Sequence, residues 1–248
     1  MSSALVSCDI SGPVATLVMD DGKSNVVSPR LLQDLNAALD RAEKAGAVVL
    51  LSGREGVFSA GFDLNIIRRG GPAEALAMLR GGFETAERLL AFPTPVVIAC
   101  SGHALAMGAF LLLSGDYRIG AAGDFRLCTN EVAIGLTMPQ AGVEICRQRL
   151  LPSHLTRAAL LAETYAPEAA LAAGFLDRLA PMAELRATAL AAALEFAQLD
   201  MRAHYRTKLR VRRDALRAIR RAHRGDTMDF IVEGARRQLG ARKGARAA

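Results

Sequence analysis

The sequence lacks the features of disulfide-rich, metal-binding and membrane-spanning proteins. Its four cysteines are widely spaced with no C-x-x-C pair, and its four histidines do not have the short spacings of metal ligands. The longest apolar run, residues 104–113, is too short to cross a bilayer, and the N-terminus has no basic residue ahead of an apolar run. We therefore expect a cytoplasmic protein with reduced cysteines, no bound metal and no membrane anchor.

Acidic residues are scarce at the C-terminal end, so the charge is uneven along the chain. From residue 201 onward there are 15 Lys and Arg against 4 Asp and Glu, whereas residues 1–200 have 16 against 21. A basic tail can meet nucleic acid, phosphate or a partner subunit, or it can be a solvated helical face. Aromatic rings that could stack on bases are nearly absent there, since Phe230 is the only ring after Tyr205. We therefore expect no nucleic-acid partner.

Strand and helix patterns alternate over the first 150 residues. Residues 5–10 and 14–19 alternate as in a hairpin, and residues 47–51 and 96–100 are short apolar runs typical of strands buried on both faces. Apolar residues recur at helical spacing between these runs, and the pattern after residue 152 is almost wholly helical. The sequence therefore predicts an α/β fold with a parallel sheet, crossover helices and a helical C-terminal region.

Two turns rich in glycine and alanine could present backbone N–H groups to a ligand. One is FSAGFDL at residues 58–64, and the other is SGHALAMGA at residues 101–109. Small residues allow a ligand to approach the main chain, and the first turn of a helix leaves N–H groups unpaired. If the two turns face one another, they supply two donors for a developing enolate oxygen. In the second turn, His103 could line a pocket or make a structural hydrogen bond to a neighbouring strand.

A glutamate follows the next predicted strand. Glu131 lies in the segment TNEVAIG, residues 129–135, beside an apolar run. Burial there would raise the pKa of its carboxyl group, as suits a general base. The alternative is a solvent-facing turn residue or a helix cap.

These segments together resemble the crotonase (enoyl-CoA hydratase/isomerase) superfamily, as does GDYRI at residues 115–119. The resemblance implies a crotonase-like spiral of ββα units that binds acyl-CoA over residues 1–185. It also implies a helical extension over residues 186–248 that takes part in trimerisation and lies near CoA. The implied substrate is an acyl-CoA thioester of lipid metabolism, and the implied assembly is a homotrimer or homohexamer. No separate cofactor is expected, because CoA is part of the substrate.

The resemblance also assigns roles within the site. Glu131 would move the proton, and the backbone N–H groups of Phe62 and Met107 would bind the thioester oxygen. Asp63 could contact substrate or only cap the following helix, and Lys208 or a nearby arginine would meet the 3′-phosphate of CoA from a neighbouring subunit. The residues expected along the substrate path are Lys23, Asn25, Ala60, Asp63, Leu64 and Phe110.

One position departs from the pattern of two-glutamate hydratases. Their first catalytic glutamate comes three residues after the second oxyanion amide, and here that residue is Phe110, which cannot activate water. Moving a double bond needs only one base, and Phe110 would help to keep water out. We therefore expect a Δ3,Δ2-enoyl-CoA isomerase. An enoyl-CoA hydratase and a catalytically silent acyl-CoA binder are the alternatives. Glu144 could substitute as a second acid, or it could be an ordinary residue of a helix surface.

Overall fold

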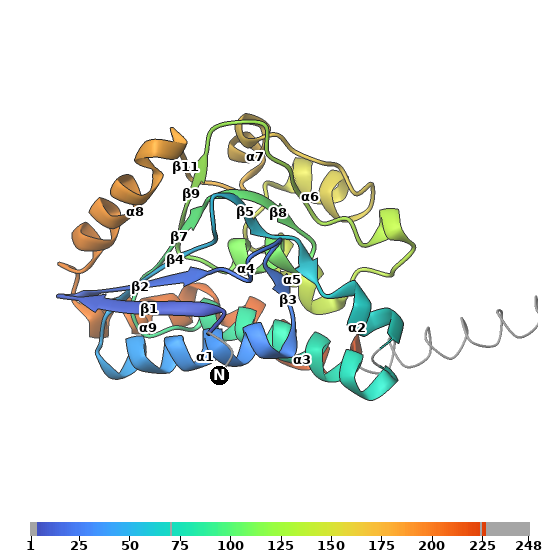
Figure 1. The fold of residues 1–248 in the computed structure, drawn as a ribbon, viewed down its shortest axis with the longest axis horizontal. Helices are drawn as coiled ribbons and strands as arrows, with labels where there is room; N and C mark the ends of the chain where they lie inside the picture. The colour runs from blue at the N-terminus through green and yellow to red at the C-terminus, as the bar shows by residue number, and fades with distance from the viewer. Residues whose placement is uncertain (1–3, 70, 224, 227–248) are drawn as a thin grey trace, which may run out of the picture.

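A six-stranded sheet forms the frame of the protein in the computed structural model, which describes residues 4–69, 71–223 and 225–226 (Figure 1). Its strand order is β1-β2-β4-β7-β9-β11. The first two strands form the predicted antiparallel hairpin, and the others run parallel to β2. The strands are β1 (Val6–Ser11), β2 (Val14–Met19), β4 (Val48–Ser52), β7 (Val96–Cys100), β9 (Tyr117–Ala121) and β11 (Arg178–Ala180).

Three strands of the main sheet continue into a second sheet of three parallel strands. β5 (Gly56–Ser59) follows β4, β8 (Gly102–Leu105) follows β7, and β10 (Leu127–Cys128) follows β9. Helices come after the first two of these strand pairs, so the predicted spiral of ββα units is confirmed. A small third sheet pairs β3 (Val26–Val27) with β6 (Gly61–Phe62).

The side chains of the buried parallel strands alternate between two hydrophobic cores, because successive residues of a strand point to opposite faces. Val49, Leu51 and Ile98 pack on the face that α1, α3 and α4 cover, whereas Leu50 and Val97 pack on the face that α8 covers. Figure 1 shows α8 across the sheet from α1 and α3. The helices are α1 (Pro29–Lys44), α2 (Leu64–Arg69), α3 (Gly71–Leu90), α4 (Met107–Leu113), η1 (Val132–Ile134), α5 (Gln140–Arg147), α6 (Pro152–Ala159), α7 (Pro167–Ala173), α8 (Met182–Phe196) and α9 (Met201–Val211).

The predicted boundary between residues 185 and 186 falls inside α8. Leu185, Ala189 and Ala193 of this helix pack against the main sheet, so the first part of the predicted extension completes the second core. Residues 201–211 and 213–223 continue the helical pattern, and residues 227–248 of the predicted extension lie outside the described part of the chain. None of the described helices is both long and apolar enough to cross a membrane.

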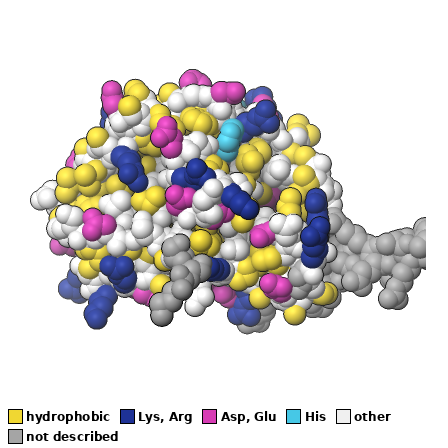
Figure 2. Space-filling view, in the orientation of Figure 1, with side chains coloured by type: hydrophobic (Ala, Val, Ile, Leu, Met, Phe, Trp, Pro, Cys, Tyr) yellow, Lys and Arg dark blue, Asp and Glu magenta, His cyan; other side chains and the backbone are white. Residues whose placement is uncertain are grey.

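Charges of both signs are mixed over the face of the molecule that Figure 2 shows. Lys and Arg side chains are scattered there among Asp, Glu and apolar side chains instead of forming one continuous basic patch. Two residues of the basic tail, Lys208 and Arg212, have a structural role, because both pair with Asp116 inside the protein.

A half-buried carboxylate, Asp116, fastens α9 to the main sheet by pairing with two buried cations. The Asp116 carboxylate accepts from Lys208 Nζ at 2.6 Å and from Arg212 Nη1 at 2.9 Å, and Lys208 also donates to the carbonyl oxygens of Phe92 and Thr94. Burial lowers the pKa of Lys208 to about 8. The Lys208 side chain is only 3% exposed, so the expectation that it meets a phosphate of CoA is wrong: its donors are already taken inside the protein.

We predict that Asp116→Asn lowers the free energy of unfolding by about 3–5 kcal/mol, because it leaves two buried cations without their carboxylate. Urea unfolding measures this loss. Asp214→Asn is the matched control, since Asp214 is exposed and pairs with its exposed neighbour Arg213; we expect a change of about 0.5 kcal/mol or less. Equal losses in the two variants would contradict the structural role of Asp116.

Candidate active site

Three parallel strands bring the predicted site residues to one edge of the second sheet. The register pairs Ser59 of β5 and Leu127 of β10 with Ala104 of β8, and Cys128 with Leu105. The two small-residue turns and the Asn130-Glu131 pair therefore all follow the carboxyl ends of adjacent strands. The Ala106 N–H donates to the Cys128 carbonyl at 2.9 Å, which ties the second turn to the strand that leads to Glu131.

The two turns lie in direct contact because glycines replace larger residues between them. A Cβ atom on Gly61 would lie 2.8 Å from the Leu105 carbonyl oxygen and 3.3 Å from the Met107 nitrogen. A Cβ atom on Gly108 would collide with the carbonyl oxygen of Ser59. Any side chain at either position would push the turns apart, so the close approach that we predicted is present.

The backbone N–H of Met107 is available to a ligand. Met107 is the first residue of α4, and its N–H has no acceptor within the described residues. The preceding residue, Ala106, has φ 49° and ψ −122°, a conformation that normally favours glycine. This strained residue turns the chain from β8 into α4, which begins at Met107.

The second predicted donor, the N–H of Phe62, belongs to β6. The Asp63 N–H donates to Val27 of β3 at 3.3 Å. Because neighbouring N–H groups of an extended strand point to opposite sides, the Phe62 N–H is directed away from β3. The Phe62 side chain packs with its ring edge toward Phe83 of α3, at a centroid distance of 6.2 Å.

Glu131 is a buried carboxylate with one unpaired oxygen. The residue is 7% exposed, and Oε2 has no hydrogen-bond partner among the described residues. Burial raises the pKa of its carboxyl group to about 7. The Cys146 thiol interacts electrostatically with this carboxylate. The pKa of the thiol is raised mainly by burial and further by the charge of Glu131. With a pKa of about 7, the Glu131 carboxyl group can take up and release a proton near neutral pH.

The position expected to hold a second glutamate is filled with hydrocarbon. Phe110 of α4 is 1% exposed, and its ring lies 5.6 Å from that of Phe83. Gly142 of α5 makes room for this ring, since a Cβ atom there would lie 2.8 Å from Phe110 Cζ. Phe110 is therefore a core residue between α3 and α5, and its place along the substrate path stays a prediction.

The remaining path residues have different positions. Lys23 and Leu64 are exposed and Ala60 is half-buried. The Asp63 carboxylate accepts from the Asn65 N–H at 2.8 Å, so the structure gives it the role of capping α2. The roles of these four residues toward CoA stay predictions.

Asn25 differs from the prediction, because it is a fully buried clamp. Its side-chain amide donates to the carbonyl oxygens of Met19 at 2.9 Å and Phe58 at 3.2 Å, and its Oδ1 accepts from the Asp21 N–H. The donors of its side chain are therefore used inside the protein, and the contact of this turn with CoA stays a prediction. Asn25 holds the loop after β2 against β5, next to the first turn of the site.

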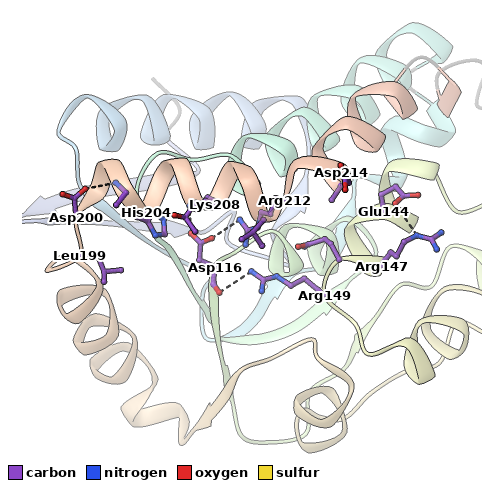
Figure 3. A pocket seen from close by; sticks show the side chains of 15 residues that line it. Asp116, Glu144, Arg147, Arg149, Leu199, Asp200, His204, Lys208, Arg212 and Asp214 are labelled. Atoms are coloured by element: carbon purple, nitrogen blue, oxygen red, sulfur yellow. Dashed lines mark hydrogen bonds and ion pairs between the residues drawn. The ribbon is translucent and has the colours of Figure 1, made fainter.

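Glu144 lies on a different surface from Glu131. It accepts from Gln140 Nε2 at 2.7 Å and pairs with Arg147 at 3.4 Å, and it lines a cleft of about 850 Å³ between α5 and α9 (Figure 3). Neither Glu131, Phe62 and Met107 nor the residues expected along the substrate path line this cleft. The structure therefore favours a surface role for Glu144. His103 accepts from the Arg126 N–H through Nδ1, which confirms the structural hydrogen bond that we weighed for it.

The sequence prediction missed three small residues that shape the site. Gly82 of α3 and Gly142 of α5 each face a phenylalanine ring, and Ala106 has the strained backbone described above. Glycines within helices were the available signal, since they cost helix stability and need a reason to be there.

Comparison with known proteins places this architecture in one family. Residues 9–234 match the model of the enoyl-CoA hydratase/isomerase family. The human mitochondrial enoyl-CoA delta isomerase 1 is 28% identical over 232 residues, which is 92% of this chain and 76% of the human protein. A probable enoyl-CoA hydratase of Bacillus subtilis is 30% identical over 142 residues, covering 56% of this chain and 55% of the relative.

Solved structures agree in fold and differ in the activity they are named for. The enoyl-CoA hydratase EchA3 of Mycobacterium ulcerans is 47% identical with a TM-score of 0.89, covering 91% of this chain and 99% of that one. An enoyl-CoA isomerase of Mycobacterium tuberculosis is also 47% identical, with a TM-score of 0.88 and coverage of 92% and 99%. The human mitochondrial Δ3,Δ2-enoyl-CoA isomerase is 26% identical, with a TM-score of 0.87 and coverage of 92% and 91%.

We predict that the burial of Glu131 makes the protein lose stability as the pH rises from about 4.5 to about 7. A carboxyl group with a raised pKa binds more protons in the folded state than in the unfolded state, so its contribution is full below the unfolded pKa and is lost as pH rises through the folded pKa. Relative to Glu131→Gln, the wild type should lose up to about 3 kcal/mol over this window.

Urea unfolding of both proteins at a series of pH values measures the difference. Glu55→Gln is the control, since Glu55 is exposed and its substitution should give no comparable trend. A stability difference between wild type and Glu131→Gln that stayed constant across the window would contradict the burial of an ionisable Glu131.

Proposed function

The chain belongs to the enoyl-CoA hydratase/isomerase family, enzymes that act on acyl-CoA thioesters, and we propose that it is a Δ3,Δ2-enoyl-CoA isomerase. One observation carries the proposal: the site has one buried carboxylate, Glu131, and the position of the second glutamate of hydratases is occupied by the buried Phe110. One base suffices to move a double bond, whereas addition of water is ordinarily shared between two carboxylates.

In the proposed reaction, the thioester oxygen accepts hydrogen bonds from the N–H groups of Phe62 and Met107. These donors stabilise the negative charge that develops on the oxygen when Glu131 removes a proton from C2. The electrons spread over a dienolate, and the protonated Glu131 then returns the proton at C4. The product is the conjugated 2-enoyl thioester, and Glu131 ends the cycle as a carboxylate.

The pKa of Glu131 supports this double task. A carboxyl group with a pKa of about 7 is a stronger base than an exposed glutamate, yet it gives its proton back readily near neutral pH. The hydrocarbon around Phe110 leaves no second acid among the described residues at the position from which a hydratase would activate water.

Hydration of a 2-enoyl thioester is the second candidate function. It is favoured by the naming of several relatives as hydratases, among them the Bacillus subtilis and Mycobacterium ulcerans proteins. The isomerase proposal is favoured by the human relative named as an isomerase and by the single carboxylate of the site. The Mycobacterium tuberculosis protein is named as an isomerase in one structure and as a probable hydratase in another. A catalytically silent acyl-CoA binder would keep both N–H donors and use Glu131 only structurally.

Assembly as a homotrimer or homohexamer, a place in the cytoplasm, a role in fatty acid metabolism and the lack of a separate cofactor belong to the same proposal. Exposed leucines on the outer side of α8, Leu190 and Leu194, support burial against another subunit.

We predict that purified protein converts trans-3-enoyl-CoA to the conjugated thioester and that Glu131→Gln lowers kcat by about 10²–10⁴-fold, since it removes the acid and base. Binding of the thioester should persist, because both N–H donors belong to the main chain. The kcat of the wild type should rise with pH through about 7, as Glu131 loses its proton. Ultraviolet absorption of the conjugated thioester follows the reaction.

Glu144→Gln is the matched control and should keep wild-type turnover, because Glu144 lies in the separate cleft. trans-2-Enoyl-CoA is offered in parallel. Rapid formation of 3-hydroxyacyl-CoA from it would favour the hydratase. Binding without turnover of either thioester would favour the silent binder.

A further inference from the structure

Two adjacent glycines lie inside the continuous helix α3, although neither needs the backbone freedom of glycine. Gly81 and Gly82 lie in the middle of a 20-residue helix, and neither has a positive φ. Glycine at an interior position lowers the stability of a helix, because it loses more conformational freedom on folding than any other residue. A close contact is the remaining explanation, and only one of the two glycines has a severe one.

Gly82 lies where the side chains of both proposed oxyanion donors meet. A Cβ atom on Gly82 would lie 2.6 Å from Phe62 Cε1, 2.7 Å from Phe62 Cζ and 3.3 Å from Met107 Sδ. A Cβ atom on Gly81 would meet only the end of the Leu32 side chain, at 3.3 Å. Phe62 and Met107 are far apart in the sequence, so α3 is a common support for two turns that come from different ββα units.

The ring of Phe62 cannot easily give way to a larger residue at position 82. Its edge already packs against Phe83, and Phe83 in turn packs against the buried Phe110. Displacing the ring would rotate or shift the Phe62 backbone, which is part of the short strand β6. The N–H of Phe62 would then move relative to that of Met107.

We propose that Gly82 is a positioning residue of the oxyanion hole, which fixes the separation of the Phe62 and Met107 N–H groups by holding their side chains at van der Waals contact with the bare helix backbone. The inference rests on the proposed function. It adds that the spacing of the two donors depends on α3, and that an added methyl group there acts on catalysis through Phe62.

The test uses Gly82→Ala, Phe62→Leu and the double variant, with Gly81→Ala as the matched control on the same helix. kcat and KM are measured with whichever enoyl thioester the wild type turns over, because the two N–H donors serve isomerisation and hydration alike. We expect Gly82→Ala to lower kcat by about 10–100-fold, since small displacements of a catalytic group have effects of this size, with a smaller change in KM. Gly81→Ala should keep the wild-type kcat.

Phe62→Leu removes the ring atoms that the new methyl group would strike and keeps the backbone N–H. Addition of Phe62→Leu to Gly82→Ala should therefore restore kcat toward that of Phe62→Leu alone. A purely structural role would instead lower stability without this rescue. The inference is overturned if Gly82→Ala keeps wild-type kcat, loses no more than Gly81→Ala, or is not rescued in the double variant.

A second readout does not need turnover. A 3-ketoacyl-CoA bound in an oxyanion hole is stabilised as its enolate, which absorbs in the ultraviolet. We expect the enolate signal of the wild type to persist in Gly81→Ala, to weaken in Gly82→Ala and to return in the double variant. If the wild type turned over neither enoyl thioester but gave this pattern, the proposed function would fail and the role of Gly82 would stand. Absence of both turnover and an enolate signal in the wild type would overturn both.

Discussion

The removal of the Glu131 carboxylate from water is the constraint on which the rest of the site depends. Burial without a compensating partner disfavours the charged form, and the free energy that this costs must be supplied by the surrounding packing. The three parallel strands of the second sheet end at one edge, where Phe62, Met107 and Glu131 follow β5, β8 and β10. The pKa of about 7 is therefore a consequence of the fold and not of a neighbouring charge.

Close backbone contacts convert this position into a site with a defined geometry. Gly61 and Gly108 let the two turns touch, Ala106 takes up backbone strain at the start of α4, and Gly82 seats the side chains of both donors. Charged residues act farther away: Asp116 fastens α9 to the main sheet through Lys208. Hydrocarbon thus shapes the reacting centre, whereas ion pairs secure its frame.

Much of the frame follows from local sequence patterns. The apolar runs 47–51 and 96–100 predicted the buried strands, and the small-residue turns predicted the backbone donors at the edge of the sheet. Roles that depend on distant neighbours did not follow. Asn25 and Lys208 are polar residues whose partners come from remote segments, Phe58 for the first and Asp116 for the second, so the sequence could not show that their donors are used internally. The contact of Gly82 with Phe62 has the same origin.

The central claim is that a single shielded carboxyl group carries a proton between two carbons of one substrate. Its most direct test is to supply 3-enoyl-CoA with deuterium at C2 and to determine the label in the first product formed. Because Glu131 is buried, the account predicts that part of the deuterium appears at C4 of the 2-enoyl product. First product that contains no deuterium at C4, with the deuterium removed from C2 lost wholly to water, would contradict it.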